Sequence, residues 1–529
     1  MSRRTIVWLL AIIIIIGVGV RSFNLTARSL WFDEAFSWRL IQFDMPEMIT
    51  RAIQDVHPPL YYIFLKGWKI IFASSLLSLR AFSVTLAALT IAAGYLFSSY
   101  AFRSRTAGII TALLLALSGW QIQYAWEARM YTLGTALILI SSLLLLKAVR
   151  FSKQKKASPI IAIGLWAAYA FAASASIYTH YFLFLSLAAQ ALFIFGHIIF
   201  TTKGRPGEIL QLRTTWYAVM AGILILLLYS PWIPVFIQQN SQVQESYWIP
   251  PIGGWSIPDT FYRMFAPTAN IPGHTGIGMI LLALVPITAT LGGIFLLLIG
   301  KGISLPKHSP QIQTVSRNTR DANWLVAVSS LLPFILAITL SFLGASLYQD
   351  RFFIFAHTFI IIALAVLLSR IRFKTLRLIS IVIVVLGFIA TYTSYWVELG
   401  LSKKGGAHAA TTALYEQRLP DEPIIATSPF IFFSVLHYAQ EEFNNNEPQL
   451  FSESGELAHF AGGPILKQED IIGLQVFDTT SKTLWVVDTT GFGSVPLNLP
   501  PQWRSQYQES FPEVFPYQGD VIVTKYVQK

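Results

Sequence analysis

Long apolar runs recur along this chain from its first residues to position 396. Most of the eleven runs reach the roughly 20 residues with which an α-helix crosses the hydrocarbon core of a bilayer. The pattern therefore predicts a polytopic α-helical membrane protein with about 11 transmembrane helices over residues 1–396. The runs are residues 5–20, 81–101, 106–122, 131–149, 159–178, 181–200, 216–236, 275–300, 324–346, 352–369 and 378–396.

Composition and charge agree with a chain that lives in a bilayer. Hydrophobic residues make up 54% and charged residues only 12% of the 529 residues, which does not suit a soluble protein. The net charge of +11 does not indicate nucleic acid as a partner, because the basic residues gather in short loops between apolar runs. Cysteine is absent, which excludes disulfides, thiolate metal sites and thiol nucleophiles.

The segment Leu60–Ser75 decides the orientation of the chain. It is apolar and aromatic but carries Lys66 and Lys69. Counting it as a span would reverse the membrane orientation of every later span and loop. Without it, one side of the membrane collects 20 basic residues against only Glu208 and Asp321, which is the positive-inside pattern of a cytoplasmic face. We therefore expect Leu60–Ser75 to lie as a helix in the outer interface. The N-terminus is then cytoplasmic.

The first apolar run is shorter than the others and has arginines at both ends. Arg3, Arg4 and Arg21 can snorkel to the two interfaces, which suits a short span. The alternative is a cleaved signal peptide, with Gly17 and Gly19 as a weak small-residue site. A span is the expected outcome.

A separate soluble domain is expected from about residue 397 to residue 529. Asp, Glu, Asn and Gln become frequent there, and the apolar runs shrink to strand length. Ile424–Thr427, Leu484–Thr489 and Asp520–Val527 are typical of strands, and Pro429–Ala439 of a helix that follows the first strand. We expect a small extracytoplasmic α/β domain. It shows no catalytic motif, so an accessory role is expected.

Residues that suit catalysis gather in the predicted outer loops. The first loop holds Asp33 and Glu34 in Ser-Leu-Trp-Phe-Asp-Glu-Ala-Phe-Ser, and Asp55 and His57 before a Pro-Pro pair. Adjacent carboxylates close to lipid give up hydration to stay charged, so they are seldom kept without a partner or a task. Structural roles stay open for single residues, such as helix capping by His57 and snorkelling by the arginines. The other loops add Glu127, Arg129, Tyr131, His180, Tyr181 and Arg351.

Taken together and in order, the loop motifs resemble those of a known family. They read Leu-Trp-Phe-Asp-Glu-Ala, His-Pro-Pro-Leu-Tyr-Tyr, Glu-Ala-Arg-Met-Tyr, Thr-His-Tyr and Asp-Arg-Phe-Phe. The set resembles the membrane-embedded GT-C glycosyltransferases that use polyprenyl-phosphate-linked sugars, particularly the branch of protein O-mannosyltransferases and lipid A aminoarabinose transferases. The resemblance covers roughly residues 1–396. It implies a GT-C fold, with Asp33 as the base that activates the acceptor and with the donor phosphate near the basic residues of these loops.

The chain departs from that family at two places. The aminoarabinose transferases carry a lysine before Pro-Pro, where this chain has His57. Many relatives have Tyr where this chain has Phe352 after Arg351. The identity of the sugar therefore stays open.

The residues suit transfer from a sugar phosphate on chemical grounds as well. Phosphate is a good leaving group, so one base suffices, whereas a glycosidase needs two carboxylates that flank the scissile bond, and sequence neighbours point in different directions. We expect Asp33 to deprotonate or orient an acceptor hydroxyl as it attacks the anomeric carbon with inversion. Glu34 is expected to position the acceptor or to help hold a divalent cation. His57, Arg129 and Arg351 are expected to stabilise the departing phosphate.

The expected partners follow from this chemistry. They are a polyprenyl-phosphate-linked sugar donor, a glycan, lipid or protein acceptor, and the bilayer of the cell (inner or plasma) membrane. Outer loop 237–274 is rich in aromatic residues and either folds over the site to select the acceptor or anchors the chain in the interface. A divalent cation is possible, although the chain has no short ligand motif such as His-Glu-x-x-His.

Other classes of membrane protein also have eleven spans. A transporter or flippase for a lipid-linked or small envelope substrate is the main alternative, and a ligand sensor is the second. A transporter is expected to show ionisable residues within spans, paired broken helices or related halves. Here the spans are nearly free of charge, and the polar residues crowd one face. An oligosaccharide ligase is a further enzyme alternative that shares the lipid-linked donor.

Overall fold

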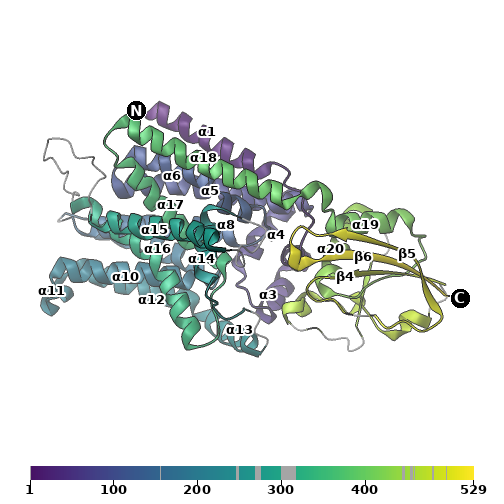
Figure 1. Ribbon diagram of the computed structural model, residues 1–529. Coiled ribbons are helices and arrows are strands. Elements are labelled where there is room, and N and C mark those ends of the chain that lie inside the picture. The colour runs from purple at the N-terminus through teal and green to yellow at the C-terminus, as the bar shows by residue number, and fades with distance from the viewer. Residues whose placement is uncertain are drawn as a thin grey trace.

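The molecule has two parts of different architecture that lie end to end (Figure 1). A long bundle of helices holds the N-terminus, and a smaller α/β domain holds the C-terminus at the far end. The computed structural model describes residues 2–154, 156–245, 249–267, 276–299, 317–443, 447–452, 457, 459–478, 482–495 and 497–528. The expected combination of a helical membrane part and a C-terminal α/β domain is confirmed.

Helices of membrane length make up most of the bundle. Among the described residues, nine helical stretches are long and apolar enough to cross a membrane, or ten if a bent pair counts as one span. The bent pair is α6 (Arg105–Leu117) and α7 (Gly119–Ala125), which meet at 58°. The chain is therefore a multi-pass membrane protein. The nine stretches contain α1 (Arg3–Ser22), α5 (Leu76–Phe102), α8 (Tyr131–Ser152), α9 (Pro159–Ile177), α10 (Leu183–Thr202), α12 (Arg213–Tyr229) with η1 (Ser230–Trp232) and α13 (Ile233–Glu245), α16 (Arg317–Leu343), η2 (Asp350–Phe353) with α17 (Ile354–Ser369), and α18 (Lys374–Leu399).

Each of the eleven predicted apolar runs coincides with a helix. Ten runs fall on the stretches and the bent pair, and the run 275–300 falls on α15 (Gly276–Ile299). Two short helices lie between spans, α11 (Pro206–Gln211) at the end of the bundle away from the sheet, and α14 (Ser256–Phe265) (Figure 1). Parts of two predicted loops, residues 246–248 and 268–274 of the outer loop and residues 301–316 of a basic loop, lie outside the described residues.

Arg21 supplies hydrogen-bond donors to the backbone carbonyls at the break between α6 and α7. Carbonyl groups at the end of a helix lose their intrahelical partners. Nη2 of Arg21, in the last turn of α1, donates to the carbonyl of Leu115 at 2.9 Å, and Nη1 donates to that of Ala116 at 2.7 Å. The indole of Trp126 in turn donates to the Arg21 carbonyl at 2.8 Å. This arrangement fixes where α7 ends and where the loop before α8 begins.

Three helices fill the long loop between α1 and α5, namely α2 (Phe32–Leu40), α3 (Met45–Gln54) and α4 (Leu60–Phe72). The helix α4 begins at the residue predicted for the interfacial helix, and its 13 residues are too few for a span. Its Lys66 donates to the carbonyls of Ile41 and Phe43 just beyond the end of α2. The helix α4 thereby holds the C-terminal end of α2, as a cation near a helix C-terminus can.

The C-terminal domain is built on a mixed sheet. Its described residues form six strands in the order β3-β2-β1-β4-β6-β5, in which β3, β2, β1 and β4 are parallel and β6 is antiparallel to both of its neighbours. The three predicted strands and the predicted helix lie where expected, whereas α19, β2, β3 and β5 were not predicted. The elements are α19 (Gly406–Gln417), β1 (Ile424–Ala426), α20 (Pro429–Tyr438), β2 (Gln449–Phe451), β3 (Ile471–Ile472), β4 (Thr483–Thr489), β5 (Trp503–Pro512) and β6 (Asp520–Gln528).

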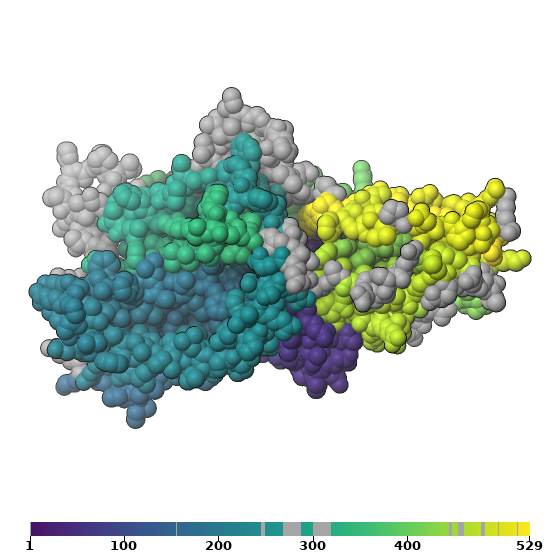
Figure 2. All heavy atoms as spheres, turned by 90° about the horizontal axis from the view of Figure 1, so that it is seen from below, coloured from purple at the N-terminus to yellow at the C-terminus, as the bar shows by residue number. Residues whose placement is uncertain are grey.

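One buried hydrophobic cluster joins the two parts of the molecule. It includes Trp38 of α2, Tyr61 of α4 and Leu79 of α5 together with Phe433 and Leu436 of α20. Seen from below, the first loop (purple) lies at the surface between the helices of the bundle and the C-terminal domain (Figure 2). The loop that carries Asp33 therefore lies between the two parts and packs against both of them.

Candidate active site

Asp33 lies in the first turn of α2, where free backbone N–H groups favour a carboxylate. Its side chain is 21% exposed, and its Oδ2 lies 3.4 Å from Nη1 of Arg351 and 3.9 Å from Nε of Arg129. Among the residues that the structure describes, Oδ1 of Asp33 has no hydrogen-bond partner. One carboxylate thus meets two guanidinium groups from two other loops and keeps one oxygen available.

Arg129 is the centre of a hydrogen-bonded network around Asp33. Its Nη1 donates to the Asp33 carbonyl at 3.2 Å, and to the hydroxyls of Ser37 and Tyr62, each at 3.3 Å. Its Nη2 lies 3.1 Å from Nε2 of His57. Its Nε, which is buried, has no hydrogen-bond partner within the described parts of the chain. Its nearest carboxylate oxygen is Oδ2 of Asp33, at 3.9 Å, which is too far for a hydrogen bond.

The network assigns the tautomer of His57. Arginine only donates hydrogen bonds, so Nε2 of His57 accepts from Arg129. The ring proton then lies on Nδ1, which is 2.8 Å from Oδ2 of Asp55. Asp55, which follows the end of α3, orients the imidazole, and the imidazole orients Arg129. Hydrogen bonds thus link Asp55, His57 and Asp33 of the first loop through Arg129 of the second.

Glu34 has a different environment from that of its neighbour Asp33. Its carboxylate is fully buried and receives two hydrogen bonds from Arg80, of 2.9 and 2.6 Å, and one of 2.9 Å from the Ala128 N–H. Burial opposes the charged form, but Arg80 and Arg28 outweigh it and hold the pKa of Glu34 below its usual range. This geometry does not favour the expected contact of Glu34 with an acceptor or a cation. It favours a role in positioning Asp33 against the loop of Arg129.

Glu127 differs from the other carboxylates of the site because its charge is poorly compensated. It lies in the loop between α7 and α8 and is buried, and its closest cation is Arg28, at 4.0 Å. Burial raises the pKa of Glu127 to about 7, while Arg28 opposes the shift. This group therefore changes its charge near neutral pH.

The remaining expected residues lie around this centre. The ring of His180 is 5.0 Å from that of Phe352 and 6.0 Å from that of Tyr131, so the three form an aromatic wall. Burial, and then the charges of His57, Arg129 and Arg351, keep the pKa of His180 well below its usual value. Tyr181 is directed elsewhere, since its hydroxyl donates to Gln239 and accepts from Trp232.

The structure thus brings some expected residues into direct contact and separates others. Asp33, Asp55, His57, Arg129 and Arg351 form one network, Tyr131 and His180 line it, and Glu34, Glu127 and Tyr181 face other partners. Arg28, Arg80 and Tyr62 were not predicted as members. Tyr62 lies in a quoted motif, and Arg80 is an arginine at the edge of an apolar run, which is the signal that was available.

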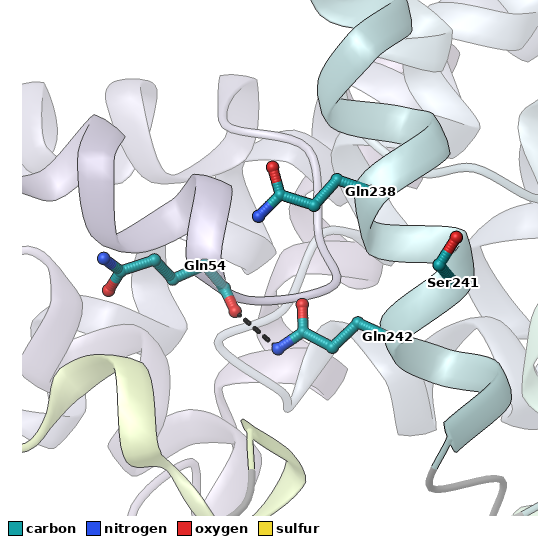
Figure 3. A pocket seen from close by; sticks show the side chains of 4 residues that line it. All are labelled: Gln54, Gln238, Ser241 and Gln242. Atoms are coloured by element: carbon teal, nitrogen blue, oxygen red, sulfur yellow. Dashed lines mark hydrogen bonds between the residues drawn. The ribbon is translucent and has the colours of Figure 1, made fainter.

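An open groove lies between α3 and α13, beside Gln54, the residue that precedes Asp55 (Figure 3). Its volume is about 330 Å³, and it is lined by Gln54, Gln238, Ser241 and Gln242. The amides of Gln238 and Gln242 point from α13 towards α3, and Gln242 donates to the Gln54 carbonyl at 3.0 Å. Gln239 also donates to the last carbonyls of α3. The glutamines of α13 therefore cap α3 directly before Asp55.

The possible divalent cation stays a prediction. Within the described parts of the chain, no three side chains of His, Asp or Glu lie close enough together to hold a metal ion. Asp55 and His57 bond to each other, and Glu34 bonds to Arg80.

The fold is similar to that of solved membrane glycosyltransferases. No family model and no curated protein matches the chain. ArnT from Cupriavidus metallidurans in the apo state is similar over 99% of this chain and 98% of its own, with a TM-score of 0.59 and 12% sequence identity. The same protein bound to undecaprenyl phosphate gives a TM-score of 0.58 at 11% identity. The Archaeoglobus fulgidus oligosaccharyltransferase in the apo form gives 0.51 at 13% identity over 84% of this chain and 64% of its own. At these identities the likeness shows the fold alone, which this chain shares with ArnT and with the oligosaccharyltransferase.

Proposed function

We propose that the chain is a membrane glycosyltransferase that moves a sugar from a polyprenyl-phosphate donor to an acceptor hydroxyl. The observation that carries the proposal is the convergence of Arg129 and Arg351 on the partly exposed carboxylate of Asp33. A base beside two permanent cations suits a reaction in which a proton leaves the nucleophile while charge grows on a departing phosphate. The GT-C fold supports the same reaction class, since the ArnT structure named above was solved with undecaprenyl phosphate.

In the proposed reaction Asp33 acts on the acceptor. Its free Oδ1 takes the hydroxyl proton as the acceptor oxygen attacks the anomeric carbon, and the bond from that carbon to the phosphate oxygen breaks with inversion. The electron pair of this bond leaves with the polyprenyl phosphate. One C–O bond forms and one breaks at the anomeric carbon, while the acceptor O–H bond breaks and its proton bonds to Oδ1 of Asp33.

Arg129 and Arg351 are the proposed phosphate ligands. Their contacts with Asp33, at 3.9 and 3.4 Å, are longer than the roughly 2.7–2.9 Å of tight charge-assisted hydrogen bonds. The buried Nε of Arg129 has no acceptor among the described residues, and in the proposed complex it donates to a phosphate oxygen. His57 keeps Arg129 in this orientation, and Asp55 keeps His57 in the required tautomer.

The site is assigned to the extracytoplasmic side of the cell membrane. The loops at the other end of the bundle carry the excess of lysine and arginine, including Lys153, Lys203 and Arg205 around α11 and the end of α8 (Figure 1). The N-terminus is then cytoplasmic, and the C-terminal domain lies outside with the site.

The groove between α3 and α13 supports a hydroxyl-rich acceptor. Its lining residues are three glutamines and one serine, all uncharged, and Gln54 turns its backbone carbonyl rather than its side-chain amide towards Gln242. Amides donate and accept hydrogen bonds, as sugar hydroxyls do, without attracting ions. Among the described residues the side-chain amide of Gln238 has no hydrogen-bond partner, so it is available to a ligand. A glycan acceptor is the class that fits this lining.

A transfer assay tests the proposal. Purified protein in lipid nanodiscs receives polyprenyl-phosphate-linked mannose, glucose or aminoarabinose with an envelope glycan and glycolipid extract, and free polyprenyl phosphate and glycosylated products are measured. We expect transfer by the natural chain and a loss of about 10²–10⁴-fold in turnover for Asp33→Asn. Asp44→Asn is the matched control, because Asp44 is an exposed N-cap in the same loop.

Two outcomes would overturn the proposal. The first is normal transfer by Asp33→Asn. The second is movement of the lipid-linked sugar across liposomes by the natural chain with no glycosylated product, which would make the chain a transporter.

A further inference from the structure

We infer that the C-terminal domain binds α2 in the crevice at the carboxyl edge of its parallel strands and thereby sets the orientation of the helix that carries Asp33. The inference rests on the proposed function, because it makes the domain a positioning element for the proposed base. The domain would then be part of the active site although it contributes no reacting group.

The topology of the sheet places this crevice. From β1 the chain moves to β2 and β3 on one side, whereas β4 lies on the other side of β1. Open α/β sheets bind their ligands outside the carboxyl ends of the strands where the order reverses in this way. The strand β6 ends at the C-terminus, far from the bundle, and β4 is antiparallel to it, so β4 runs towards the bundle (Figure 1).

An aromatic side chain of the membrane part occupies the crevice. Phe430, the second residue of α20, follows β1, and Phe492 follows β4, and their ring centroids are 4.9 Å apart. Phe32, the residue before Asp33, places its ring 4.7 Å from that of Phe430 and 6.3 Å from that of Phe433. The place where related topologies hold a ligand therefore holds the first residue of α2.

The other end of α2 is also held by the domain. Nη2 of Arg39 bonds to both carboxylate oxygens of Asp470 at 2.8 Å, and both side chains are 3% exposed. Asp470 accepts a further bond from the Lys467 N–H, which fixes its carboxylate. The ring of Trp38 meets the edge of His437 at 4.9 Å. The contacts at Phe32 and at Arg39 thus anchor both ends of this nine-residue helix.

The opposite side of α2 faces the reaction. Asp33 turns towards Arg129 and Arg351, and Glu34 is held by Arg80 from α5. The helix therefore lies between the C-terminal domain and the bundle, with its polar contacts distributed over both. Displacement of a reacting group by about 1 Å can lower a rate about a hundredfold. Loss of the domain contacts should therefore be visible in turnover even where the chain stays folded.

Hydrogen exchange tests whether the contacts at Phe32 and Arg39, here called the clamp, hold α2 in place. Phe430→Ala removes the partner of Phe32, and Asp470→Asn leaves Arg39 without its counter-charge. Phe477→Ala is the matched control, because this buried aromatic residue packs on Phe451, at 5.7 Å, in a separate cluster of the same domain. We expect amide exchange in residues 32–40 to rise about tenfold or more in the first two variants and to stay unchanged in the control. Equal exchange in all three variants would overturn the inference.

Turnover separates positioning from general stability. At a temperature where all variants are folded, Phe430→Ala should lower kcat about 10- to 100-fold, and the Kd for undecaprenyl phosphate should stay within about twofold. Phe430→Leu should recover most of the kcat, and Phe477→Ala should keep it. Faster exchange with unchanged kcat would overturn the positioning role. A natural chain that transfers no sugar from any donor would overturn the proposed function. The exchange result would still show whether the C-terminal domain holds α2.

Discussion

The Glu34 carboxylate accepts a 2.9 Å hydrogen bond from the backbone N–H of Ala128. Each partner is the sequence neighbour of a residue in the candidate site, since Glu34 follows Asp33 and Ala128 precedes Arg129. One bond between two loops therefore fixes how the carboxylate and the guanidinium approach each other. Arg80 completes this junction with two further bonds to Glu34.

Glu34→Gln should unfold more easily than the natural chain and should lose most of its transfer activity. The substitution leaves the buried Arg80 without its counter-charge, which costs about 3–5 kcal/mol in comparable buried pairs. Thermal unfolding in detergent measures the first effect, and the transfer assay measures the second. Glu47→Gln is the control, because Glu47 pairs with Arg51 at the surface, and it should change stability by less than about 0.5 kcal/mol. A Glu34→Gln chain as stable as this control would contradict the role of the junction.

Arg129→Lys should lower turnover by about 10²–10³-fold although the charge is kept. Lysine cannot reproduce the planar set of donors that reaches the Asp33 carbonyl, Tyr62 and His57 together. Arg205→Lys, at an exposed surface pair, should leave turnover unchanged. Initial rates of polyprenyl phosphate release provide the measurement. Equal rates for the two variants would argue against a phosphate ligand at Arg129.

The stability of the protein should fall as the pH rises towards 7, and Glu127→Gln should remove this fall. The raised pKa of Glu127, about 7, means that the folded chain holds a proton which the unfolded chain releases near pH 4.5. Stabilisation from this proton is complete below pH 4.5 and is lost by about pH 7, with a total of up to about 3 kcal/mol. Melting temperatures between pH 5 and 8 test this. The melting temperatures of the natural chain and the variant should differ most at pH 8. The variant should then be the more stable, because its buried glutamine stays neutral. Parallel curves would show that Glu127 is charged throughout.

Gln238→Ala should raise the KM for the acceptor about 5- to 10-fold and leave kcat and the KM for the donor unchanged. The substitution removes an amide that lines the groove but that bonds to no described residue. The loss of one hydrogen bond to a ligand corresponds to about 1–1.5 kcal/mol. Gln244→Ala, further along α13 and outside the lining, is the control. A change in the donor KM instead would assign the groove to the donor.

The membrane part of the fold was predictable because its signal is local. A run of about 20 apolar residues has few alternatives to a span, so each predicted run coincides with a helix. Strands β1, β4 and β6 were also predicted, since they are short apolar segments with clear ends. The strand β5 was missed because it lies at the edge of the sheet and exposes most of its residues, so polar Ser505 and Glu509 interrupt the apolar face that starts at Trp503.

The candidate site was predicted in its members but not in their separate roles. Charged residues in loops on one face pointed to Asp33, His57, Arg129 and Arg351, and the structure brings these together. The sequence indicates that Asp33 and Glu34 point in different directions, but it does not identify the partner of Glu34, because Arg80 lies 46 residues away. Pairing over such a distance depends on how α2 and α5 pack, and no local pattern reports it.

Arg21 also has a consequence for the order in which the chain assembles in the bilayer. A carbonyl without a partner in hydrocarbon costs several kcal/mol, so the bend between α6 and α7 is expensive for an isolated segment. Its donors come from the end of α1, which leaves the ribosome earlier. We therefore expect the bent pair to be stable in the bilayer only when it packs beside α1. Buried Arg21 thus ties the stability of the bend to a helix that begins the chain, almost a hundred residues upstream.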